Sequence, residues 1–206
     1  MHDALSAFGF RLYYYYALRP PQGASGPPAQ GGTEAPPADP EVSVRRAGRG
    51  DLEAVVRLGM ESVHYHASLE PTMRVPRDEG KKMRRRFETV LAEPGESTIF
   101  VAELQRQIAG FYSIYLQSID DSWTPPLFAP GRYGLIAEVA VDPRFRKRGI
   151  GHRLFDAASQ WFHERGARSF WLIYLPANPL SSRFWTSLGF APVWEVLLQD
   201  EGGPLC

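Results

Sequence analysis

One stretch of the sequence, residues 138–158 (EVAVDPRFRKRGIGHRLFDAA), limits the fold more than any other. It is typical of a strand that ends at Val141, a turn at Asp142 and Pro143, a basic loop with two glycines, and a helix that begins near Gly149. Strands and helices that follow one another in this way build α/β folds. The sequence therefore predicts a mixed α/β domain.

Apolar periodicity places further elements on both sides of this stretch. Runs of alternating, β-branched and aromatic residues predict strands over residues 42–44, 98–104, 108–116, 133–141, 169–175 and 190–198. Apolar residues at helical spacing predict a helix that opens at Gly50 and helices over residues 77–93, 149–166 and 180–188. In the second of these helices, the basic residues between positions 81 and 86 are expected to form a solvated face.

The N-terminal residues 1–41 differ from the rest in composition. Residues 19–41 are dense in Pro, Gly and Ala and contain no large apolar side chain, which is typical of a disordered linker. The preceding run from Tyr13 to Tyr16 is interpreted as part of a poorly ordered tail, with a short docked segment as the alternative. We expect one domain over residues 42–200, followed by a tail of residues 201–206.

Charge and cysteine content exclude several classes of protein. The 23 basic and 23 acidic residues balance, which argues against a dedicated nucleic-acid binder. The single cysteine is Cys206, so neither a disulfide framework nor a cysteine zinc site is expected, and a reducing cytoplasm is the natural compartment. No apolar run approaches the roughly 20 residues of a membrane helix. His64 and His66 have no third ligand nearby in sequence, so no metal is expected.

The loop before the helix of residues 149–166 has the features of a phosphate site. A helix N-terminus carries unpaired N–H groups and the positive end of the helix dipole, and glycines at 149 and 151 allow close approach. Basic residues surround the loop: Arg144, Arg146, Lys147, Arg148 and Arg153. The Gly-Lys-Ser/Thr of a P-loop is missing, and Leu154 stands where a dinucleotide fingerprint has its third glycine. A pyrophosphate ligand is predicted, and a dinucleotide such as NAD stays open as one candidate for it.

Two motifs resemble the GNAT family of N-acetyltransferases. Arg146-x-x-Gly149-x-Gly151 matches the family's Q/R-x-x-G-x-G/A motif, and residues 178–190 resemble its N-x-x-A-x-x-x-Y-x-x-L-G-F element. The resemblance spans residues 42–198. It implies the GNAT fold, an α/β arrangement with a mixed central sheet of six to seven strands flanked by about four helices. It also implies transfer of an acetyl group from acetyl-CoA, the co-substrate, to a primary amine of a small molecule, peptide or protein.

The resemblance also assigns residues to the acetyl-CoA site. Backbone N–H groups of residues 147–151 would bind the pyrophosphate, and the strand at residues 139–141 would pair with the pantetheine arm. A backbone N–H near Val139 would stabilise the oxyanion, and Asn178 would contact the arm or the acetyl group. The residues implied are Val139, Ala140, Val141, Arg146, Lys147, Arg148, Gly149, Ile150, Gly151, His152, Asn178 and Trp185.

Glu138 is the candidate general base, acting through a water molecule, and the alternative is a surface carboxylate or the partner of an arginine. Trp185 occupies the position of the family's acidic tyrosine, and an indole N–H is too weak an acid for that role. The thiolate would then leave unprotonated, or Tyr174, Ser181 or Ser182 would donate the proton. A catalytically weak CoA-binding regulatory module is the alternative function.

By the same resemblance, the acceptor amine would meet the first two helices, their connector (residues 64–76) and the hairpin loops. His66 and Glu70 are candidates for contact with it, and three aromatic residues could form a wall: Trp123, Phe128 and Tyr133. No nucleic acid and no membrane are expected as partners, and the reading allows for a homodimer.

Overall fold

The computed structural model of the chain describes residues 10–21, 39–70, 72–93, 95–120 and 128–199. The chain divides into two compact units. The larger consists of the described part of Thr33–Phe170, and the smaller of the described parts of Met1–Gly32 and Trp171–Cys206. No helix within these described ranges has both the length and the apolar character needed to cross a membrane.

The larger unit contains four antiparallel strands in the order β2-β3-β4-β5. Their bounds are Ser43–Arg46 for β2, Ser97–Leu104 for β3, Gln107–Ile119 for β4 and Gly131–Val141 for β5. Gln105 and Arg106 connect β3 to β4, and both have a positive φ, of 52° and 59°. Such backbone angles are typical of a tight hairpin turn whose twist matches that of its strands. The strands predicted in this region are confirmed.

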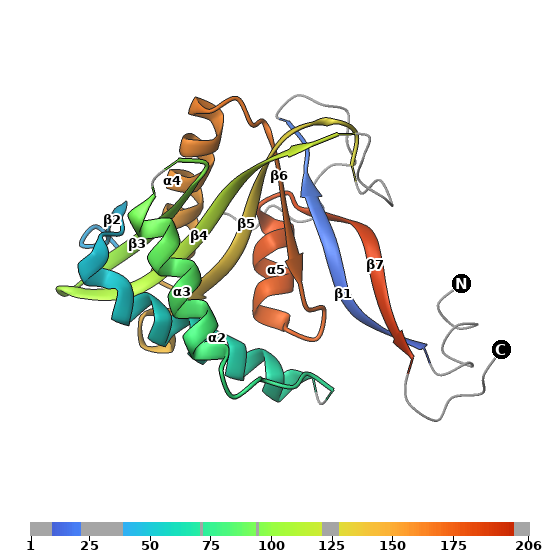
Figure 1. Ribbon diagram of the computed structural model, residues 1–206, viewed down its shortest axis with the longest axis horizontal. Helices are drawn as coiled ribbons and strands as arrows, with labels where there is room; N and C mark the ends of the chain where they lie inside the picture. The colour runs from blue at the N-terminus through green and yellow to red at the C-terminus, as the bar shows by residue number, and fades with distance from the viewer. Residues whose placement is uncertain (1–9, 22–38, 71, 94, 121–127, 200–206) are drawn as a thin grey trace. The chain divides into compact units, whose positions relative to one another are not determined.

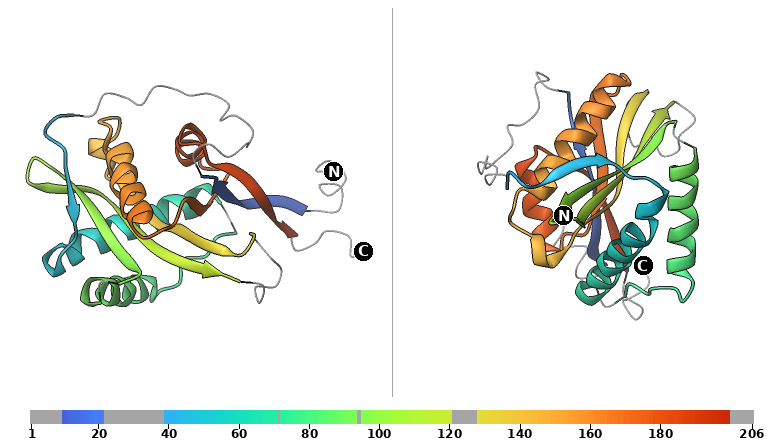
Figure 2. Two further views of the ribbon diagram at one scale, coloured as in Figure 1. Left: turned by 90° about the horizontal axis from the view of Figure 1, so that it is seen from above. Right: turned by 90° about the vertical axis from the view of Figure 1, so that its left-hand side faces the viewer.

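Helices cover both faces of this sheet. Helices α2 (Leu52–Leu69) and α3 (Glu79–Ala92) lie on one face and α4 (Ile150–Glu164) lies on the other, as Figures 1 and 2 show. Short 3-10 turns, η1 (Arg49–Asp51) and η2 (Pro143–Phe145), precede α2 and α4. On the α2–α3 face, apolar side chains of the helices and strands form one buried cluster, which includes Val55, Leu58, Met83, Phe87, Val90, Ile99, Val101 and Phe111.

The smaller unit is built from strands β6, β1 and β7, which neighbour one another in that order, and helix α5. Their bounds are Ser169–Tyr174 for β6, Phe10–Arg19 for β1, Ala191–Gln199 for β7 and Pro179–Ser187 for α5. Strand β1 pairs with β7 in antiparallel register. With these elements, seven strands and four α-helices are found in the described residues, which confirms the expected GNAT fold of the α/β class.

Strand β1 corrects the prediction of a poorly ordered N-terminal segment for residues 10–19. Tyr16 stacks on Trp171 of β6, with ring centroids 5.8 Å apart and an interplanar angle of 20°. Tyr15 contacts Tyr174 of the same strand at 5.4 Å. Aromatic residues have a high strand propensity, and this segment finds its partner β7 about 180 residues further along the chain. Most of the expected linker (residues 22–38) and the tail of residues 201–206 lie outside the described residues.

Gly134 of β5 gives a direct test of packing between the sheet and α4. A Cβ atom at this position would lie 2.6 Å from the ring of Phe162, which is fully buried and cannot move aside. We expect Gly134→Ala to lower the free energy of unfolding by about 1–3 kcal/mol, the usual cost of overpacking a core. Chemical denaturation would measure it. Gly50→Ala is the control, because no atom lies within 4 Å of its added Cβ, and equal stability of the two variants would contradict this packing.

Candidate active site

Strand β5 contains a β-bulge in the middle of its pairing with β4. Ser113 pairs with Glu138, but the next residue of β4, Ile114, pairs with Ile136. Ala137 is therefore an extra residue on β5, with no counterpart on β4. A bulge of this kind shifts the alternation of side chains by one position along the strand that carries it.

The bulge turns Glu138 towards the face covered by α2 and α3. Before the bulge, the Cα–Cβ direction of Gly134 points at Phe162 of α4. After it, Glu138 contacts Arg86 of α3, and Ala140 packs against the α2–α3 core. Without the extra residue, Glu138 would point to the same face of the sheet as Gly134 and would therefore face α4.

Glu138 is held by α3 and leaves one oxygen without a partner. Arg86 donates from Nε to Glu138 Oε1 at 3.2 Å and from Nη2 to Glu79 Oε1 at 3.3 Å. The Glu138 side chain is 25% exposed, yet its Oε2 atom is buried and has no hydrogen-bond partner among the described residues. Buried carboxylate oxygens are normally satisfied, so an orphaned one is a candidate for binding water or a ligand.

The surroundings of Glu138 favour its protonated form. Burial raises the pKa of the Glu138 carboxyl above its usual value, and Glu79 adds to the increase, whereas Arg86 and Ser113 oppose it. Burial also raises the pKa of Tyr115, which lies two residues after Ser113 on β4 and packs against the α2–α3 core. Of the two interpretations made from sequence, the structure shows that Glu138 is the partner of an arginine. The role of general base stays a prediction, with which a raised pKa is compatible.

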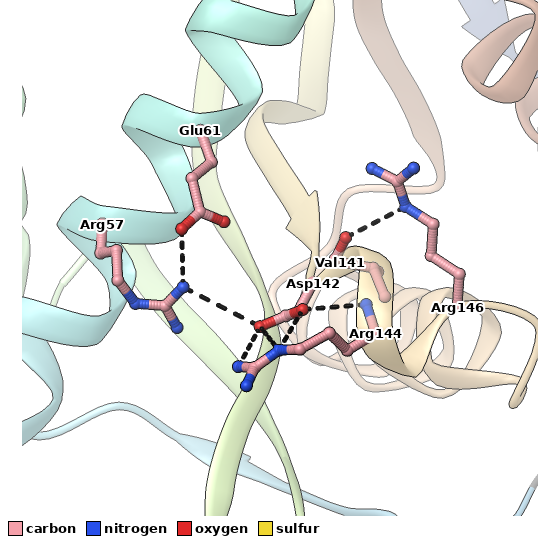
Figure 3. A network of polar contacts seen from close by, with 6 residues as sticks. All are labelled: Arg57, Glu61, Val141, Asp142, Arg144 and Arg146. Carbon is pink, nitrogen blue, oxygen red and sulfur yellow. Dashed lines mark hydrogen bonds and ion pairs between the residues drawn. The ribbon is translucent and has the colours of Figure 1, made fainter.

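The turn after β5 is fixed by a buried carboxylate (Figure 3). Asp142 Oδ1 accepts from the backbone N–H of Arg144 at 3.0 Å, and Oδ2 accepts from Arg144 Nη2 at 2.7 Å. Arg57 of α2 pairs with Glu61 at 2.8 Å and lies 3.9 Å from Asp142. The hydrogen bonds from Arg144 lower the pKa of Asp142, so this group stays ionised. The network connects the start of the loop to helix α2.

The loop before α4 has a backbone conformation that is suited to an anion site. Lys147 and Gly149 both have a positive φ, of 63° and 73°, and Gly149 is the N-cap of α4. The first hydrogen bond inside α4 runs from Arg153 N to Gly149 O. The N–H groups of residues 150–152 therefore precede the helical ladder, where they can bind an anion. Successive N–H groups in such alternating backbone conformations form an anion-binding concavity.

Three of the basic side chains near the loop are engaged elsewhere in the larger unit. Arg144 binds Asp142, Arg148 pairs with Asp39 at 3.2 Å, and Arg153 donates to the backbone carbonyl of Val42. Arg146 donates from Nε to Val141 O at 3.3 Å, and its guanidinium lies 5.7 Å from the ring centroid of Tyr65. Lys147 has no ion pair among the described residues.

The remaining predicted positions of the larger unit surround this loop. Ile150 is buried, and Gly151 O accepts a hydrogen bond from the buried Tyr112 hydroxyl at 3.2 Å. Burial lowers the pKa of His152, which keeps it neutral, although Asp156 opposes this shift. Ser62 of α2 donates to Val139 O at 3.4 Å. The loop, β5 and α2 are thus joined by several contacts.

The predicted residues of the smaller unit have structural contacts of their own. Asn178 is the N-cap of α5, where its Oδ1 accepts from the N–H groups of Leu180 and Ser181. Trp185 is buried and packs edge-to-face on Phe184 and Phe190. The hydroxyls of Ser181 and Ser182 donate to backbone carbonyls. Burial raises the pKa of Tyr174, which makes it a poorer proton donor.

The structure brings together only some of the residues that were predicted to contact the acceptor amine. Glu70 is buried and accepts from Thr72 Oγ1 at 2.7 Å, and burial lowers the pKa of His66. Phe128 stacks on Tyr133 at 5.4 Å, whereas Trp123 lies outside the described residues. No group of three or more His, Cys, Asp or Glu side chains in the described part could hold a metal ion.

Arg86 is a residue of the candidate site that sequence reasoning missed. It belongs to the basic run that was interpreted as a solvated face, and it contacts Glu138, which lies 52 positions further along the chain. No local sequence signal distinguishes Arg86 from the other basic residues of this run, because the contact depends on how α3 packs on the sheet.

The raised pKa of Glu138 predicts a dependence of stability on pH. A carboxyl whose pKa is higher in the folded than in the unfolded protein stabilises the fold below its unfolded pKa of about 4.3, and this contribution is lost as the pH rises through the folded pKa. Replacing it with a neutral isostere should therefore stabilise the protein at high pH. We expect Glu138→Gln to raise Tm more at pH 8 than at pH 4.

Thermal melts across this range would test the stability prediction. Glu88→Gln is the control, because it removes an exposed carboxylate of α3 that lies 4.0 Å from its nearest arginine. A loss of stability in Glu138→Gln at pH 8 would show that the ion pair with Arg86 outweighs the cost of burial.

Comparison with known proteins agrees with this arrangement. The chain is 28% identical over 146 residues to an uncharacterized N-acetyltransferase of Archaeoglobus fulgidus, which covers 71% of this chain and 90% of the relative. The fold of the present chain is similar to that of a mutant protein from Bacillus halodurans (TM-score 0.64, 23% identity, with 80% of this chain and 99% of that chain covered).

Two similar structures contain a coenzyme. One is the aminoglycoside N-acetyltransferase AAC(6')-Iy in complex with CoA (TM-score 0.57, 20% identity, 78% and 95% covered). The other is a predicted acetyltransferase from Clostridium acetobutylicum with acetyl-CoA (TM-score 0.51, 21% identity, 69% and 88% covered). Residues 61–190, more than half of the chain, match the model of the acetyltransferase (GNAT) family, and this protein therefore belongs to that family.

Proposed function

We propose that this protein is an N-acetyltransferase that transfers the acetyl group of acetyl-CoA to a primary amine of a small molecule, peptide or protein. One observation carries the proposal: a loop with a glycine N-cap at the start of α4 follows a bulged strand, and that strand carries a half-buried carboxylate with one oxygen that has no partner among the described residues. Membership of the family and the coenzyme-containing neighbours support the same assignment over a dinucleotide enzyme.

The loop is suited to the pyrophosphate of acetyl-CoA. In the proposal, the backbone N–H groups of residues 147–151 bind it, with charge from the side chains of Arg146 and Lys147. The positive φ of Lys147 and Gly149 supports this role, because it turns successive N–H groups towards one centre. Residues 139–141 of β5 would pair with the pantetheine arm, as an added strand pairs with a sheet edge.

The chemistry requires a proton acceptor and a hydrogen-bond donor for the carbonyl oxygen. Bound acetyl-CoA supplies the thioester, whose C–S bond breaks as the amine nitrogen forms the new C–N bond. Glu138 would accept the ammonium proton through a water molecule on its Oε2 atom. A backbone N–H near Val139 would stabilise the developing oxyanion.

The leaving thiol does not require a protein acid in this proposal. Trp185 is buried among aromatic rings, and an indole N–H does not give up its proton at neutral pH. The raised pKa of Tyr174 also makes that residue a weak donor. Because a thiol has a pKa of about 8.5, the CoA thiolate can leave unprotonated. The second proton, which the nitrogen loses after the C–N bond has formed, then passes to this thiolate or to water.

The phosphate loop can be tested with a matched pair of glycine variants. A β-branched residue at a positive φ is strained and blocks close approach of a phosphate, so Gly149→Val should weaken binding of acetyl-CoA. Loss of a hydrogen bond to a charged group costs about 1.5–3 kcal/mol, so the Kd should rise roughly tenfold or more.

Gly166→Val is the control for the loop. Gly166 has a similar φ of 82° at the other end of α4, with no atom within 4 Å of an added Cβ. It reproduces the backbone strain away from the loop and should leave the Kd unchanged. Isothermal titration with CoA would measure both variants, and an unchanged Kd in folded Gly149→Val would refute the pyrophosphate site.

The proposed base can be tested by kinetics. Glu138→Gln should lower kcat by about a hundredfold, within the usual range for a general base, and should leave the affinity for CoA almost unchanged. Thiol release with a panel of amines would measure turnover, and a wild-type pH–rate profile in this variant would remove Glu138 from the role. Tight binding of CoA without turnover on a broad panel would instead indicate a CoA-binding regulatory module.

A further inference from the structure

Arg86 bridges two carboxylates that belong to different elements. Its Nε atom donates to Glu138 on β5, and its Nη2 atom donates to Glu79, two turns earlier on α3. A planar guanidinium that donates to two carboxylates through two of its nitrogen atoms has a more defined position than one in a single surface ion pair. The bridge occupies Oε1 of Glu138 and leaves Oε2 without a partner among the described residues.

Arg86 differs from its neighbours in the basic run. Arg84 pairs with Glu53, whose side chain is 76% exposed, and Lys82 pairs with Asp78, which is 56% exposed. Exposed pairs of this kind contribute little to stability and do not affect a buried group. The Glu138 side chain is only 25% exposed, so its interaction with Arg86 is screened less by water.

The charged and titratable groups around Glu138 come from two packed elements. Helix α3 contributes Arg86 and Glu79, and strand β4 contributes Tyr115. Helix α2 contributes the uncharged hydroxyl of Ser62, which binds the adjacent carbonyl of Val139. Arg86 is the cation in this set, and it acts against the burial that favours the protonated carboxyl.

We propose that Arg86 is a positioning residue for the base: its guanidinium binds Oε1 of Glu138, favours the charged form of that carboxyl and fixes its orientation so that Oε2 receives the proton. This inference rests on the proposed function for its catalytic meaning. Its physical content, control of the ionisation of Glu138 by Arg86, does not depend on the identity of the acceptor.

Titration of the carboxyl by NMR tests this control directly. In protein labelled with carboxyl-¹³C glutamate, the Glu138 signal is assigned as the one absent from Glu138→Gln. Arg86→Gln should raise the pKa of Glu138, and Arg86→Lys, which keeps the charge but cannot bridge both carboxylates, should restore it in part. Glu79→Gln should lower it, because a like charge is removed.

Arg84→Gln is the matched control, since it removes a neighbouring arginine that pairs away from Glu138. It should leave the titration of Glu138 unchanged. An unchanged or lowered pKa of Glu138 in Arg86→Gln overturns the proposal. If that variant does not fold, Glu79→Gln decides, and an unchanged or raised pKa of Glu138 there overturns it equally.

Kinetics then separate this inference from the proposed function. Arg86→Gln should move the acidic limb of the kcat/KM profile to higher pH, with activity recovering at alkaline pH, and Arg86→Lys should move it less. A uniform loss at every pH would mean a structural role and would overturn the positioning role. If the NMR shifts occur but the wild type turns over no amine, the enzymatic proposal fails while the control of Glu138 by Arg86 stands.

Discussion

The β-bulge at Ala137 decides where the candidate active site lies in the larger unit. One extra residue in β5 reverses the alternation of its side chains, so that Gly134 faces α4 and Glu138 faces α3. The face that Glu138 enters is already filled by the core of α2 and α3. The carboxylate is therefore desolvated, and the bulge is the reason that a polar residue stands beside an apolar cluster.

Burial of the charged Glu138 carboxylate lowers the stability of the fold, and such a cost is common for groups that act in catalysis. Burial favours the neutral carboxyl, and Arg86 partly offsets this preference. A carboxyl with a raised pKa, one bound oxygen and one oxygen without a partner among the described residues is suited to accept a proton, as the proposed general base must. The loop before α4 differs from this, because the groups proposed to bind the pyrophosphate are backbone N–H groups, whose directions follow from the φ angles of Lys147 and Gly149.

The features of the fold and of the candidate site that depend on residues close together in the chain could be predicted from the sequence. The elements of the larger unit follow apolar periodicity, and the loop follows glycines and basic residues at a helix start. Long-range features were missed. The tyrosines of β1 gave no sign of their pairing with β7, and the bulge at Ala137 is invisible in a sequence that alternates on either side of it.

The sequence by itself thus determined the α/β class, the order of the elements, the glycine-containing loop before α4 and the residue types near it, because these depend on contacts between residues close in the chain. Only the tertiary structure decided which basic side chains near the loop bind other groups of the protein and which arginine contacts Glu138. Those outcomes depend on the packing of α3 and α4 against the sheet, which joins residues 52 or more positions apart. Apolar periodicity predicts which face of a helix or strand is buried, but only the tertiary structure shows which element packs against that face.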